Sequence, residues 1–147
     1  MNQKLLSLLF FLVSLFSHSQ SVIWKTNMND AILLSNEERK PILIFFTAGS
    51  SQKIQSEVFS SPDFIDWSDS VVLLKLDLAD ASVPDLEKEQ NLRLKEALGI
   101  EELPQFCIAT ASVRKNKPTI NKLGLFDYKT GGAKTWISQA KDVLRGE

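Results

Sequence analysis

Histidine and cysteine are nearly absent from this 147-residue sequence, which has one of each, His18 and Cys107. A single cysteine cannot form a disulfide within the chain, and a dithiol exchange cycle would lack its second thiol. Zinc and copper sites are built on several imidazole or thiolate ligands, so we expect no such metal and no cofactor. A serine or cysteine nucleophile also needs a nearby base, and the sequence around Cys107 supplies no histidine.

The first residues have the pattern of a cleaved export signal. Lys4 gives a short positive start, an apolar run follows from Leu5 to Phe16, and Ser17-His18-Ser19 supplies the small residues that a signal peptidase reads. The apolar run is shorter than the roughly 20 residues of a membrane-spanning helix. We therefore predict a signal peptide over residues 1–19, cleaved after Ser19 or Gln20. The protein is expected to be exported, either periplasmic or secreted, with no stable membrane insertion after cleavage.

Charge is balanced along the rest of the sequence. The chain has 17 Lys and Arg residues against 18 Asp and Glu residues, and no basic cluster stands out. Nucleic acid and anionic membrane surfaces are therefore not expected as partners. Residues 20–147 have the length of one domain with one core, and no internal repeat or low-complexity tract divides them. We predict a single domain over this range.

Hydrophobic patterns predict alternating strands and helices. The unbroken apolar run over residues 42–46 is typical of a strand buried on both faces, and a second strand is expected over residues 71–76. The intervening residues 48–70 are long enough for a right-handed crossover, so these two strands should be parallel. Helices are expected over residues 27–38, 51–59, 62–67 and 85–98 and after Gly131-Gly132, with further strands over residues 22–24, 106–109 and 119–126. This order predicts an α/β fold, with a mixed central sheet and helices on both faces.

Four segments, in this order, resemble exported domains of the thioredoxin family. They are Lys-Pro-Ile-Leu-Ile-Phe-Phe-Thr, Glu-Val-Phe-Ser-Ser-Pro-Asp-Phe, Leu-Lys-Glu-Ala-Leu-Gly-Ile and Gly-Gly-Ala-Lys-Thr-Trp-Ile. The resemblance implies a thioredoxin-like three-layer fold over nearly the whole mature chain. In that family, the loop after the central strand carries Cys-x-x-Cys. Here the loop is shorter and reads Ala48-Gly49-Ser50-Ser51, which implies a redox-inactive member.

The resemblance also implies a binding site. Leu103-Pro104 matches the family's cis-proline, which faces the loop and exposes the backbone of the preceding residue to an extended peptide. We expect Gly49, Ser50, Ser51, Leu103 and Pro104 to form such a site. The alternatives are a trans proline that only starts a strand, a serine that only caps the next helix, and a loop whose free N–H groups hold an anion.

Acidic residues gather after the second predicted strand. The group consists of Asp77, Asp80, Asp85, Glu87 and Glu89, and its spacing does not match a calcium-binding loop. We expect a solvated acidic surface.

Cys107 lies between Phe106 and Ile108 in a predicted strand, so we expect it to be buried and unreactive. Three functions are compatible with the sequence. The first is a redox-inactive domain that binds or scaffolds another protein or an extended peptide. The second is a protein related to thiol-disulfide oxidoreductases, acting through Cys107 with a partner's thiol. The third is a purely structural component of the envelope. The sequence does not identify the partner.

Overall fold

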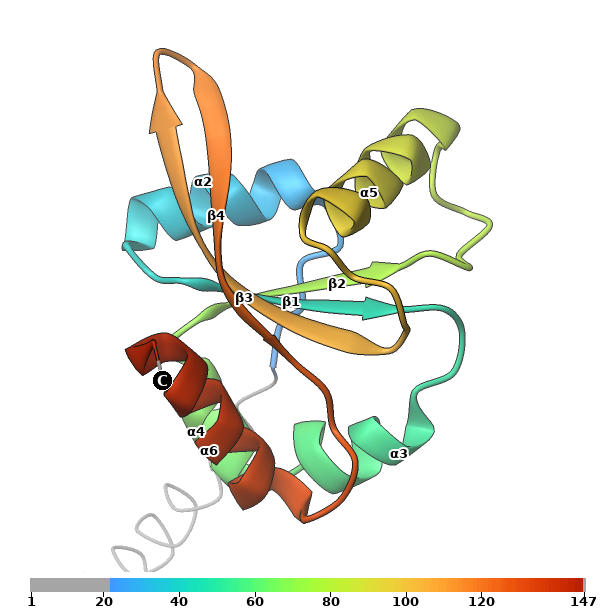
Figure 1. Ribbon diagram of the computed structural model, residues 1–147, viewed down its shortest axis with the longest axis vertical. Coiled ribbons are helices and arrows are strands. Elements are labelled where there is room, and N and C mark those ends of the chain that lie inside the picture. Colours follow the sequence, from blue (N-terminus) through green and yellow to red (C-terminus); the bar gives the residue numbers. More distant parts are fainter. Residues whose placement is uncertain (1–21, 147) are drawn as a thin grey trace, which may run out of the picture.

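A four-stranded mixed sheet organises residues 22–146, the part of the chain that this computed structural model describes (Figure 1). The predicted signal peptide lies outside the described residues. The strands are β1 (Ile42–Thr47), β2 (Val72–Asp77), β3 (Gln105–Arg114) and β4 (Lys117–Phe126), in the order β2-β1-β3-β4. The β1–β2 pair is parallel, as predicted, whereas the β1–β3 and β3–β4 pairs are antiparallel.

Helices cover both faces of this sheet, which confirms the predicted three-layer architecture. Figure 1 shows α2 (Met28–Glu38) and α5 (Asp85–Ala97) on one side. The other side carries α3 (Gln52–Ile54), the π-helix η1 (Gln55–Phe59), α4 (Pro62–Ser68) and α6 (Gly132–Arg145). None of the helices within residues 22–146 is long and apolar enough to span a bilayer.

The central strand β1 is buried at all of its positions, which explains its unbroken apolar sequence. Because side chains alternate along a strand, Leu43 and Phe45 pack toward α4 and α6, whereas Ile44 and Phe46 pack toward α2 and α5. On the first face, Phe106 stacks between Phe45 and Phe126, with ring centroids 4.8 and 5.2 Å apart. This aromatic layer makes up much of that half of the core.

The predicted strand over residues 22–24 is reduced to a single bridge. Lys25 pairs in parallel with Leu74 at the outer edge of β2. The Lys25 N–H donates to Leu73 O, and Lys75 N–H donates to Lys25 O, both at 2.8 Å. The segment covers part of the β2 edge without becoming a fifth strand.

The helix predicted over residues 51–59 has two parts, because its turns widen from α3 to η1. The Ser60 N–H donates to the Gln55 carbonyl five residues earlier, at 3.0 Å, and the Ser60 hydroxyl donates to the same oxygen at 2.8 Å. This double contact holds the wide final turn in place.

The β3–β4 hairpin is longer than predicted and extends beyond the start of β1, since Ile42 lies opposite Ala109 while β3 continues to Arg114 (Figure 1). Its turn residues, Lys115 and Asn116, have φ values of 51° and 61°, as two-residue hairpin turns require. Pro118 lies in β4, where an edge strand tolerates its missing N–H.

Close packing of β4 against α6 gives a test of the fold. A Cβ atom at Gly124 would lie 2.9 Å from Val143 Cγ1. We therefore expect Gly124→Ala to lower the free energy of unfolding by about 1–3 kcal/mol, because the valine must move. The measurement is denaturant unfolding. In a Val143→Ala background the same change should cost less, and an equal cost in both backgrounds would contradict this packing.

Candidate functional site

The two halves of the predicted site lie at one end of neighbouring strands. Phe46, near the end of β1, lies opposite Gln105, the first residue of β3. Because the two strands are antiparallel, the loop that leaves β1 and the residues that enter β3 are brought to the same edge. The structure thus brings residues 48–51 and residues 103–104 together at one end of the sheet. We call this end, where β1 finishes and β3 begins, the Leu103–Pro104 edge.

The Leu103–Pro104 peptide bond is cis, as the family resemblance implied. The Leu103 side chain is half-buried against the core between the sheet and the α2–α5 layer, whereas Pro104 is exposed. Within residues 22–146, neither the N–H nor the C=O of Leu103 forms a hydrogen bond. The backbone of Leu103 is therefore held by its side chain, while its polar groups stay available to a ligand.

The loop after β1 is fixed by a carboxylate from β2. Gly49 adopts a φ of 94°, which favours glycine, and its N–H donates to Asp77 Oδ1 at 3.1 Å. The same oxygen accepts the Ala79 N–H at 3.0 Å. The loop amide thus holds an anion, but the anion is the chain's own Asp77. Asp77 is therefore more than part of a solvated acidic surface, because its carboxylate also holds the loop of the predicted site.

Neither serine of the loop caps the following helix. Ser51 occupies the position before α3, but its hydroxyl makes no capping hydrogen bond. Its carbonyl instead accepts the Gln55 N–H at 2.9 Å. Ser50 is exposed. The capping alternative is therefore wrong for both side chains, and in the described part of the chain no histidine is present to activate either hydroxyl.

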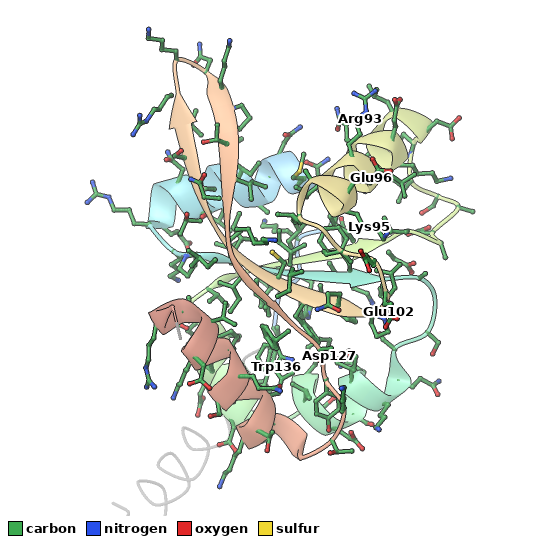
Figure 2. All side chains as sticks on the ribbon, viewed as in Figure 1. Arg93, Lys95, Glu96, Glu102, Asp127 and Trp136 are labelled. Carbon is green, nitrogen blue, oxygen red and sulfur yellow. The ribbon has the colours of Figure 1, made fainter. Side chains whose placement is uncertain are left out.

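Acidic side chains flank the open backbone. Glu101 and Glu102 are exposed immediately before Leu103, and Figure 2 shows Glu102 where the chain enters β3. Lys53, the nearest cation along the loop and its helix, donates instead to the Lys129 carbonyl at 3.0 Å. The rim next to Leu103 is therefore negative and favours a positively charged ligand.

A tyrosine that the sequence analysis did not single out attaches η1 to the start of α6. The Tyr128 hydroxyl donates to Glu57 and accepts the Gly132 N–H, the latter at 3.1 Å. The hydrogen bond to Glu57 raises the pKa of Tyr128, with smaller contributions from desolvation and the glutamate charge, so the phenol keeps its proton. Only a long-range contact reveals this role, since Glu57 and Tyr128 are far apart in the sequence.

Cys107 is fully buried, which confirms its predicted place in the core. It lies in the cluster between the sheet and the α2–α5 layer, and burial raises its pKa from 9.0 to about 12. The nearby Lys122 charge opposes this shift only in part. A thiol in this environment carries almost no thiolate at neutral pH and is a poor nucleophile.

The role of Asp77 is testable by hydrogen exchange. Asp77→Ala should speed exchange at the Gly49 amide and cost about 1 kcal/mol of stability, because two exposed N–H groups lose a charged acceptor. Asp80→Ala is the matched control, since Asp80 accepts from the Ser82 N–H and hydroxyl in the next turn. Equal exchange at Gly49 in both variants would contradict the anchoring role.

The buried thiol gives a pH-dependent prediction. Above pH 9 the unfolded chain releases the Cys107 proton while the folded protein keeps it up to about pH 12. The unfolded state then binds fewer protons, so the free energy of unfolding should fall as pH rises through this window. Denaturant unfolding at several pH values should show a smaller fall in Cys107→Ala. Identical pH dependence in the two proteins would mean that the thiol is not buried.

Comparison with known proteins finds one relative by sequence and several solved structures with a similar fold. No family model matches the chain. The chain is 30% identical over 120 residues to the thioredoxin-related protein DsbJ of Chlamydia pneumoniae, an alignment that covers 77% of this chain and 33% of that protein. It therefore spans about a third of the length of this relative.

Two solved structures share the architecture. A DsbH oxidoreductase superposes with a TM-score of 0.65 at 20% identity, covering 85% of each chain. A thioredoxin from Thermus thermophilus superposes with a TM-score of 0.61 at 14% identity, covering 84% of this chain and 88% of the other. The chain therefore has the thioredoxin-like α/β fold that its sequence implied. Its relative in Chlamydia pneumoniae is also named as thioredoxin-related.

Proposed function

We propose that this protein is an exported thioredoxin-like domain that binds an extended peptide, or an extended segment of another protein, at the Leu103–Pro104 edge. In this proposal it performs no dithiol exchange of its own. The observation that carries the proposal is the open Leu103 backbone, which lies at the same edge as a loop that contains no thiol.

Binding at this edge would use backbone hydrogen bonds. A peptide strand that runs past Leu103 finds a free N–H and a free C=O, which is a local form of strand addition. The edge is also rigid, because the Leu103 side chain packs into the core and Asp77 holds the loop at Gly49. A site that is already ordered loses little conformational entropy on binding, which favours affinity.

The chemistry around the edge supports binding without exchange. A dithiol cycle needs two thiols within reach of each other, and this sequence has one. That thiol is buried, with a pKa of about 12, and so is not presented to a ligand at the edge.

The charge of the rim supports a preference among peptides. Glu101 and Glu102 are exposed beside the open backbone, while Ser50 and Ser51 are uncharged. Peptides with a lysine or arginine next to the paired segment are therefore favoured over acidic ones, and the preference weakens as salt is added.

We include export in the proposal, and its support comes from the amino-acid sequence of residues 1–19. The positive start, the apolar run and the small residues of residues 1–19 support a cleaved signal, and the location would be periplasmic or secreted.

A second candidate has one observation in its favour. The relative with 30% identity is named as thioredoxin-related, so a thiol-disulfide protein that uses Cys107 with a partner's thiol is a coherent alternative. It requires Cys107 to become accessible, and the full burial of this side chain opposes it. A structural role in an envelope assembly would need the same protein-binding edge, but without a released peptide.

Peptide binding can be tested directly. We expect panning of a displayed library of short peptides against the purified protein to enrich basic, extended sequences. Addition of a selected peptide should shift the amide NMR signals of Gly49, Leu103 and Gln105. Ser50→Arg should raise the Kd of that peptide roughly tenfold, because it places bulk and positive charge on the edge.

Asn36→Arg is the control for that variant, because Asn36 is exposed on α2, away from the edge residues. It adds the same side chain and should leave the Kd unchanged. If the two variants bind equally, or if the shifted signals lie elsewhere on the protein, then the Leu103–Pro104 edge is not the binding site.

A further inference from the structure

A groove with walls of opposite charge runs between α4 and α6. It has a volume of about 560 Å³, and Asp63, Asp66 and Trp67 line one side while Lys134, Ile137 and Lys141 line the other. Neither helix contributes a residue to the Leu103–Pro104 edge. The groove is therefore a second surface of the protein, separate from the proposed peptide site.

The charges in the groove are segregated by helix. Asp63 and Asp66 are exposed on α4, whereas Lys134 and Lys141 are exposed one above the other on α6, seven residues apart. Among the described residues, none of these four side chains forms an ion pair. Both rows of charge therefore remain available to a partner.

The floor of the groove is apolar and rigid. Trp67 is half-buried and makes an edge-on contact with Trp136, with ring centroids 5.1 Å apart. Ile137 is 9% exposed next to it. Trp136 points into the core from α6 (Figure 2), so it anchors the floor from below. An apolar centre between charged rims is the usual composition of a protein interface.

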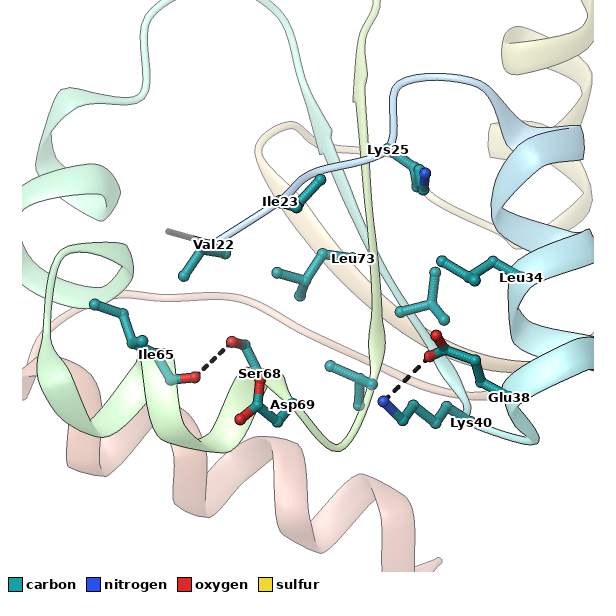
Figure 3. A pocket seen from close by; sticks show the side chains of 12 residues that line it. Val22, Ile23, Lys25, Leu34, Glu38, Lys40, Ile65, Ser68, Asp69 and Leu73 are labelled. Atoms are coloured by element: carbon teal, nitrogen blue, oxygen red, sulfur yellow. Dashed lines mark hydrogen bonds and ion pairs between the residues drawn. The ribbon is translucent and has the colours of Figure 1, made fainter. Parts of the chain in front are cut away.

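A second cavity of the protein differs from this groove, because an ion pair within the chain lies in its lining. A cavity of about 260 Å³ lies between residues 22–25, the start of β2 and the ends of α2 and α4 (Figure 3). Its lining residues Lys40 and Glu38 pair with each other at 3.1 Å, and the Ser68 hydroxyl donates to Ile65 O at 2.7 Å. Glu38, Lys40 and Ser68 thus already have partners within the chain.

We propose that the α4–α6 groove docks a second copy of this chain as a two-fold dimer. A two-fold axis in the interface, parallel to the groove, places α4 of each copy over α6 of the other. The aspartates of each copy then face the lysines of its partner on both sides of the apolar centre. An axis across the groove would instead place like charges together, so electrostatics selects one arrangement.

We infer that the groove binds a second copy of the chain, because a partner must carry charges complementary to both walls of the groove. Its surface must present a basic row opposite Asp63 and Asp66 and an acidic row opposite Lys134 and Lys141, at the width of this groove. The charge pattern around the groove of a second copy meets that description. The peptide-binding edges stay free in this dimer, so two edges would be presented together.

Sedimentation equilibrium of the purified protein, from about 1 µM to about 1 mM, tests the proposal. We expect a monomer–dimer equilibrium whose Kd rises about tenfold or more when salt is increased from about 50 mM to about 500 mM, because the paired rows are screened. A protein that stays monomeric up to about 1 mM overturns the proposal.

Charge reversal distinguishes this dimer from others. Asp63→Asn/Asp66→Lys makes both walls positive, and Lys134→Glu/Lys141→Glu makes both negative. Each variant alone should be monomeric where the unmodified protein dimerises, and an equimolar mixture of the two should form a heterodimer. Asparagine rather than lysine at position 63 avoids placing a cation in the first turn of α4.

Glu37→Gln/Glu96→Lys is the matched control, since it changes net charge as much as the first variant but lies on α2 and α5. It should dimerise like the unmodified protein. Dimers that persist in both wall variants, or a mixture of folded variants that stays monomeric, would overturn the proposed geometry. Circular dichroism establishes that each variant is folded.

Discussion

The register between β1 and β3 is the constraint on which the site depends. Phe46 lies opposite Gln105, and this pairing alone brings the loop after β1 and the Leu103–Pro104 bond to one edge. The register is fixed by packing, because β1 is buried on both faces. A slip by one residue would turn Phe45 toward α2 and Phe46 toward α6, exchanging the two halves of the core. The geometry of an exposed edge is thus determined by side chains inside the protein.

The thioredoxin-like scaffold keeps this edge ordered without a pair of cysteines. Asp77 ends the strand that runs parallel to β1, so its carboxylate arrives at the same edge and accepts the Gly49 N–H. Tyr128 and Glu57 attach the following helix to the start of α6 in a similar way. These contacts are made by polar side chains of other elements, and none of them involves sulfur. The loop is therefore a defined surface although it contains no thiol.

The sequence predicted the parts of the fold that periodicity determines. The strand at the apolar run of β1, the helix after Gly131-Gly132 (α6) and the parallel β1–β2 pair were all confirmed. The outer part of the β3–β4 hairpin was missed because most of its residues are polar or only partly buried, so it has no unbroken apolar run. At the site, the resemblance of Leu103-Pro104 to the cis-proline of the thioredoxin family predicted the Leu103–Pro104 edge. It did not give the anchor at Asp77, because a strand-end aspartate looks like any exposed acid until its neighbouring strand is known.

The two proposed surfaces use different physical means of recognition, and this separates their partners. The Leu103 edge offers backbone groups, which accept many sequences and gain selectivity from the glutamates beside them. The α4–α6 groove offers side-chain charges in two rows over a fixed aromatic floor, which accepts only a surface with the opposite pattern. An extended peptide can pair with the backbone at the Leu103 edge, but a single strand is too narrow to contact both charged rows of the α4–α6 groove. A folded copy of the same chain matches the second, and its own edges then remain exposed. Dimer formation would therefore place two peptide sites on one assembly, and a ligand with two basic segments whose linker spans both sites would bind more tightly than one with a single segment.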